Sequence, residues 1–87
     1  AGSRDNASEA LALFDEALTS RAVLPPQTVA DVLDARGRAR DQLGDSAGAR
    51  VDYSGAAAIL FSLGALARGL EICREHRIPP PTPAPTS

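Results

Sequence analysis

Residues 32–60 read VLDARGRARDQLGDSAGARVDYSGAAAIL, and this stretch decides the fold. Apolar residues recur at three- and four-residue steps on both sides of Leu43-Gly44-Asp45, as they do on one face of an α-helix. Glycine readily takes the left-handed conformation that ends a helix, and Asp45 or Ser46 could cap the helix that follows. The stretch therefore predicts two antiparallel helices joined by a tight turn.

Small residues stand where these two helices would touch. Gly37 falls in the middle of the first helix, where glycine costs roughly 1 kcal/mol relative to alanine, so we expect a packing role. In the second helix, Tyr53 lies between Ala49 and Ala56 at helical spacing. We predict that one ring fits between small side chains and that the helices approach closely there.

The run ARGRARDQLGD at 35–45, followed by AxxDYxxA at 49–56, resembles the tetratricopeptide repeat, a 34-residue helix–turn–helix unit. Leu33 stands where that family often has tryptophan, Arg40 where it often has tyrosine, and Phe61 at its usual closing proline. The resemblance implies an all-α fold of antiparallel repeats, a fragment of an α-solenoid. The implied packing positions are Leu33, Gly37, Ala39, Leu43, Gly44, Ala49, Tyr53 and Ala56.

The chain before this hairpin repeats the same spacing. Ala10, Phe14 and Ala17 precede Ala49, Tyr53 and Ala56 by 39 residues. Residues 6–20 are therefore predicted to form a helix like the second arm of a preceding repeat, with packing positions Ala10, Phe14 and Ala17. Asn6 and Glu9 have the spacing of a capping box at its start. Pro25-Pro26 is expected to open the next helix, with Thr28 and Asp31 as an alternative cap.

One small domain over residues 5–77 is expected, because a chain of 87 residues allows only one core. Its four helices are predicted at residues 6–20, 26–43, 46–61 and 62–77. The last helix either begins another repeat or caps the stack, and capping is favoured because no Leu-Gly turn follows it. Its predicted apolar stripe is Leu63, Leu66, Ala67, Leu70 and Cys73.

Both ends of the chain are expected to be disordered. Residues 1–4 include Ala1-Gly2-Ser3, which we interpret as a cloning remnant, and the lack of methionine indicates an excised or processed segment. Residues 78–87 read IPPPTPAPTS, a proline-rich tail that favours an extended linker. A ligand for an aromatic groove is the alternative for this tail.

The charge balance argues against nucleic-acid binding, because the net charge is −2 and the pI is about 5.2. Arg36, Arg38 and Arg40 alternate along one helix, so successive members point about 200° apart and form no single patch. We expect these arginines to be solvated. No apolar run is long enough to predict a membrane span. The chain is expected to be soluble, and cytoplasmic or organellar rather than secreted, although a lone cysteine leaves the compartment open.

The sequence predicts no catalytic residues, no metal site and no cofactor. His76 is the sole histidine and Cys73 the sole cysteine, and a four-coordinate metal needs more ligands than these two. We expect a buried thiol beside a surface imidazole. Asp41 and Asp45 flank the turn and are expected to be cap and solvent groups. The sequence therefore favours a binding protein over an enzyme.

The resemblance implies that the first arm of the complete repeat lines a concave groove, which receives a peptide or helix of a partner protein. Relatives that clamp a terminal carboxylate have lysine and asparagine where this chain has Asp34 and Arg38, so such a clamp is not expected. A basic or amphipathic partner suits this acidic groove, although the same residues could merely be solvated. The groove positions are Asp31, Asp34, Ala35, Arg38, Asp41 and Gln42.

A structural homo-oligomer is the alternative function. Repeat stacks usually need about three units, because each unit buries its apolar face only against its neighbours. Phe14 and Leu18 must then be covered by the central hairpin, by a second copy or by another segment. Exchange of the first helix across residues 19–28 would give a dimer.

Overall fold

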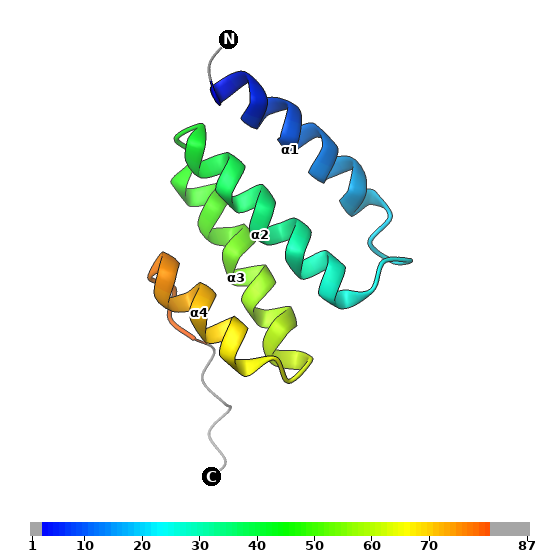
Figure 1. The fold of residues 1–87 in the computed structure, drawn as a ribbon, viewed down its shortest axis with the longest axis vertical. Helices are drawn as coiled ribbons and strands as arrows, with labels where there is room; N and C mark the ends of the chain where they lie inside the picture. The colour runs from blue at the N-terminus through cyan, green and yellow to red at the C-terminus, as the bar shows by residue number, and fades with distance from the viewer. Residues whose placement is uncertain (1–2, 81–87) are drawn as a thin grey trace.

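The computed structural model describes residues 3–80, which form a row of antiparallel helices (Figure 1). The helices are α1 (Ser3–Thr19), α2 (Pro26–Gln42), α3 (Ser46–Ser62) and α4 (Leu66–His76). Each helix packs on the next along the chain. The described part contains no strand, so the predicted all-α class is confirmed.

The turn between α2 and α3 has the predicted form. Gly44 takes a φ of +84°, a left-handed conformation that favours glycine. The Asp45 amide donates to the carbonyl oxygen of Arg40 at 2.8 Å, which closes the end of α2. The Asp45 side chain caps α3 by accepting from the Gly48 amide at 3.0 Å. The predicted cap at Asp45 is therefore confirmed.

A second turn of the same kind separates α3 from α4. Gly64 has a φ of +81°, and the Ala65 amide donates to the Leu60 carbonyl at 2.8 Å. The prediction of a helix over residues 62–77 was wrong at its start, because Leu63-Gly64-Ala65 repeats the Leu43-Gly44-Asp45 turn 20 residues later. The fourth helix consequently begins at Leu66.

The core lies where Tyr53 of α3 meets Gly37 of α2. A Cβ atom added to Gly37 would lie 2.6 Å from Cε1 of Tyr53, so only glycine leaves room for the ring. Ala49 and Ala56 beside Tyr53 are fully buried. The predicted close approach of these helices is confirmed. The core cluster is Val29, Ala30, Leu33, Ala49, Tyr53, Ala56, Ala57, Leu60, Ile72, Cys73 and Ile78.

The first helix covers α2 within the same chain. Leu18 and Leu24 pack against the core, and Phe14 is half-buried. The central hairpin thus covers Phe14 and Leu18, which was one of the three predicted alternatives. Two predicted caps were wrong. Asn6 does not cap α1, which begins before it at Ser3. Thr28 and Asp31 do not cap α2, which follows Pro25 and has no side-chain cap.

A buried ion pair joins α2 to α3, and an exposed contact extends it to α1. Arg36 of α2 binds Asp52 of α3 through two hydrogen bonds, of 3.0 Å from Nε and 2.6 Å from Nη2. Its Nη1 also donates to Asp15 of α1 at 2.8 Å. Nε of Arg40 lies 3.5 Å from the same Asp52 carboxylate. The expectation of solvated arginines was therefore wrong for Arg36 and Arg40, which face a carboxylate that α3 buries.

The predicted apolar stripe of α4 was largely wrong. Gly69, Ile72 and Cys73 face the core, whereas the side chains of the leucines point outward. A Cβ on Gly69 would lie 3.2 Å from the Phe61 ring, so the glycine side of α4 is the side that can approach α3 most closely. The outward residues are Leu63, 47% exposed, Leu66, 56% exposed, and Leu70, 43% exposed.

The expected disorder at the chain ends needs correction where the structure describes it. Ser3 and Arg4 belong to α1, and Ile78 is buried in the core. The Ile78 amide donates to the Cys73 carbonyl at 2.8 Å. Residues 1–2 and 81–87 lie outside the described part. None of the described helices is both long and apolar enough to cross a membrane.

Replacing Gly37 with alanine should destabilise the fold. The new methyl would collide with the Tyr53 ring, and this overpacking should outweigh the helix propensity of alanine, for a net loss of about 1–2 kcal/mol in the free energy of unfolding. Urea titration measures the change. Gly55→Ala is the matched control, because its nearest contact is the flexible end of Leu33 at 3.3 Å. Equal stability of the two variants would contradict the packing role of Gly37.

Candidate partner-binding groove

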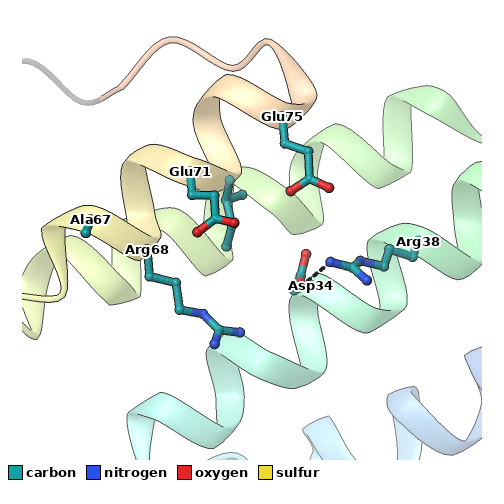
Figure 2. A pocket seen from close by; sticks show the side chains of 7 residues that line it. Asp34, Arg38, Ala67, Arg68, Glu71 and Glu75 are labelled. Carbon is teal, nitrogen blue, oxygen red and sulfur yellow. Dashed lines mark ion pairs between the residues drawn. The ribbon is translucent and has the colours of Figure 1, made fainter.

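A groove of about 400 Å³ runs between α2 and α4 (Figure 2). Because α3 packs against both helices, it holds the two walls apart. Charged side chains from both walls surround a small apolar surface. The groove is lined by Asp34 and Arg38 from α2 and by Ala67, Arg68, Glu71, Ile72 and Glu75 from α4.

The six predicted groove residues do not share one site. Asp34 and Arg38 line the groove, and Asp31 lies at its rim, where it binds Arg68. Ala35 and Gln42 instead line a hollow between α1 and α2. Asp41 lines a third hollow, with Tyr53 and His76.

The wall that α4 contributes was not predicted from the sequence. The period that the resemblance implies offered a signal, because Arg68, Ile72 and Glu75 follow Asp34, Arg38 and Asp41 by 34 residues. The second Leu-Gly turn at Leu63-Gly64 was the other sign, since it separates α4 from α3.

The groove carries an excess of acid. Nη2 of Arg68 lies 2.7 Å from Oδ1 of Asp31, and this ion pair links α4 to α2. Nη2 of Arg38 lies 3.4 Å from Oδ2 of Asp34. Both arginines are thus paired with acids of α2. Within the described residues, Glu71 and Glu75 have no ion-pair partner, and these two carboxylates set the charge of the groove.

Asp34 is buried at the base of this groove, with 9% of its surface exposed. Its Oδ1 atom is also buried and accepts no hydrogen bond from any described residue. Most buried polar atoms in proteins have a hydrogen-bond partner. The base of the groove therefore holds a carboxylate whose bonding is incomplete.

Tyr53 of α3 contacts both helices that form the groove walls. Its ring stacks on His76, with centroids 3.4 Å apart and planes 4° from parallel. Its hydroxyl donates to Oδ2 of Asp41 at 2.9 Å. The expected surface imidazole was therefore wrong, since His76 is half-buried against a core ring. Asp41 is exposed, as expected, and also accepts the hydrogen bond from Tyr53.

The arrangement suits binding by ion pairs and apolar contact. Among the described residues, no three His, Cys, Asp or Glu side chains are placed to hold a metal ion. Cys73 is buried in the core, where a substrate would not reach its thiol. The groove, by contrast, presents carboxylates beside the exposed Ala67, while the Ile72 side chain in its lining is largely buried.

Stability should fall at alkaline pH because of Tyr53. Burial, and then the hydrogen bond to the Asp41 carboxylate, raise the pKa of Tyr53 above its ordinary value. The folded state therefore holds this proton more tightly than the unfolded state, whose tyrosine pKa is about 10. We expect the free energy of unfolding to be steady below about pH 10 and to decrease above it.

Tyr53 is the only tyrosine, so phenolate absorbance of the native protein reports on this residue alone. Urea titrations across the same pH range should show the loss of stability in the native chain and a smaller one in Tyr53→Phe. A native phenolate transition near pH 10 would contradict the raised pKa.

Comparison with protein-family models, with curated proteins and with solved structures gives no match for this chain. The tetratricopeptide resemblance therefore stays a prediction that rests on the residues themselves. What the groove can bind follows from its geometry and charge.

Proposed function

We propose that this chain is a protein–protein interaction module of tetratricopeptide type, a scaffold or adaptor that binds a peptide or helix of a partner between α2 and α4. The groove itself carries this proposal. Its walls combine the carboxylates of Glu71 and Glu75 with a small apolar surface at Ala67. Interfaces commonly combine such an apolar centre with charges at the rim.

A basic or amphipathic segment fits this groove best. Its positive charges would meet Glu71 and Glu75, and an apolar side chain would cover Ala67. Complementary charge mainly sets the rate of association and the choice of partner. An acidic segment would meet like charge on the α4 wall, so we expect it to bind more weakly than a basic one.

Peptides selected from a displayed random library should show whether the groove binds. We expect selected peptides to carry net positive charge, and to bind the double variant Glu71→Arg, Glu75→Arg about tenfold or more weakly, because the α4 wall then repels them. Fluorescence anisotropy measures the affinity.

The matched control is Glu9→Arg, Glu16→Arg, which makes the same change of charge at exposed positions of α1. Equal weakening in both double variants would indicate a general charge effect and would contradict binding in this groove.

Homo-oligomerisation is a second candidate function, favoured by the outward face of α4. Leu66 and Leu70 lie one helical turn apart and are both about half exposed. Exposed apolar side chains in one patch often mark association surfaces. Helices of a second copy could cover this face, or α1 could exchange between two copies.

Sedimentation over a range of concentrations tests association. We expect the apparent mass to rise with concentration in the native chain and to stay at the monomer value in Leu66→Gln, Leu70→Gln, because that variant loses the apolar face. Val51→Gln is the matched control, since Val51 is exposed on α3, away from this face. A native chain that is monomeric at every concentration would contradict this candidate.

A further inference from the structure

Building on the proposed function, we infer that the groove is a site for one arginine side chain of the partner, whose guanidinium lies between Asp34 of α2 and the Glu71 and Glu75 carboxylates of α4. Figure 2 shows the two glutamates extending from α4 toward the α2 wall, where Asp34 and Arg38 lie. A cation between these walls would meet acids from both helices.

The first reason is the incomplete bonding of Asp34. This residue is nine-tenths buried and lines the groove, yet its Oδ1 accepts no hydrogen bond from a described residue. Its Oδ2 is 3.4 Å from Arg38, a long distance for a charge-assisted hydrogen bond. The carboxylate is therefore partly desolvated without full compensation. An incoming guanidinium would replace Arg38 at Oδ2, and because Oδ1 itself is buried, a bond to that atom would also need the Asp34 side chain to turn.

The second reason is that Arg38 can give way. Its side chain is 61% exposed, so it can turn into solvent when another cation arrives. Arg68 differs, because its 2.7 Å ion pair with Asp31 holds it at the rim. The groove thus has one arginine in a short ion pair and one in a longer pair that a partner can replace.

The geometry favours arginine over lysine. A guanidinium is planar and has five N–H donors, so it can bond to carboxylates on two walls at once. An ammonium group is a compact and strongly hydrated charge that would lose more water for fewer directed bonds. The aliphatic stem of arginine can lie against the exposed Ala67 of α4.

Nuclear magnetic resonance with small probes tests the site directly. Nα-acetyl-arginine methylamide should shift the backbone amides of Asp34, Glu71 and Glu75 in a saturable way. The lysine compound should bind several-fold more weakly, and the citrulline compound, which has the same shape without the charge, should not bind. Equal shifts with citrulline, no saturable shift with arginine, or shifts confined to other helices would overturn the inference.

Two variants sharpen the test by moving affinity in opposite directions. Arg38→Gln should strengthen binding of the arginine probe several-fold, because it removes the internal competitor for Asp34. The double variant Glu71→Gln, Glu75→Gln should weaken it about tenfold. The matched control Glu9→Gln, Glu16→Gln should leave it unchanged. Weaker binding to Arg38→Gln would overturn the exchange of one arginine for another.

The selected peptides separate this inference from the proposed function. Replacing their arginines by citrulline should abolish binding. If the citrulline peptides bind as well as before and still lose affinity for Glu71→Arg, Glu75→Arg, the groove is a partner site and the arginine inference is wrong. If no library peptide binds but the arginine probe saturates the groove amides, the cation site stands and the proposed function is wrong.

Discussion

The position of the Tyr53 ring is the constraint on which the groove depends. This side chain of α3 lies on the bare backbone of Gly37 in α2 and stacks on His76 of α4, so it touches both walls. Its hydroxyl also bonds to Asp41, which adds a directional contact with α2. Since α2 and α4 pack on α3 rather than on each other, the size of this ring and the room left by glycine set the spacing of the groove.

The buried Asp52 carboxylate fixes which face of α2 turns toward that groove. Arg36 binds Asp52 on the α3 side, so the arginine two residues later, Arg38, must point to another side of the helix. Removing one member of such a pair leaves a buried charge without compensation, which is strongly destabilising. The pair therefore holds α2 in one rotation about its axis, and with it Asp34 at the base of the groove.

The central hairpin could be predicted from the sequence because glycine and alanine at helical spacing indicate that two helices pack closely. Only the α2 wall of the groove could be predicted from the sequence. Asp34 and Arg38 lie on the predictable helix, but Glu71 and Glu75 become a wall only once the Gly64 turn sets the start of α4. The side of α4 that faces the core could not be predicted either. The leucines of α4 suggested an apolar core stripe, but α4 packs on α3 through the side that carries Gly69.

Two arginines of α2, each paired with an aspartate, show that the same ion pair can be structural or can form part of a binding site. Arg36 and Asp52 form a two-point contact as short as 2.6 Å, and Asp52 is only 1% exposed, so exchange with another cation would require α2 and α3 to separate. Arg38 and Asp34 are 3.4 Å apart, and the arginine is mostly in solvent. Exchange there needs only a side-chain rotation, and Glu71 and Glu75 across the groove already favour a second cation. A partner's cation can therefore replace Arg38 at Asp34, while the Arg36–Asp52 pair keeps α2 in place.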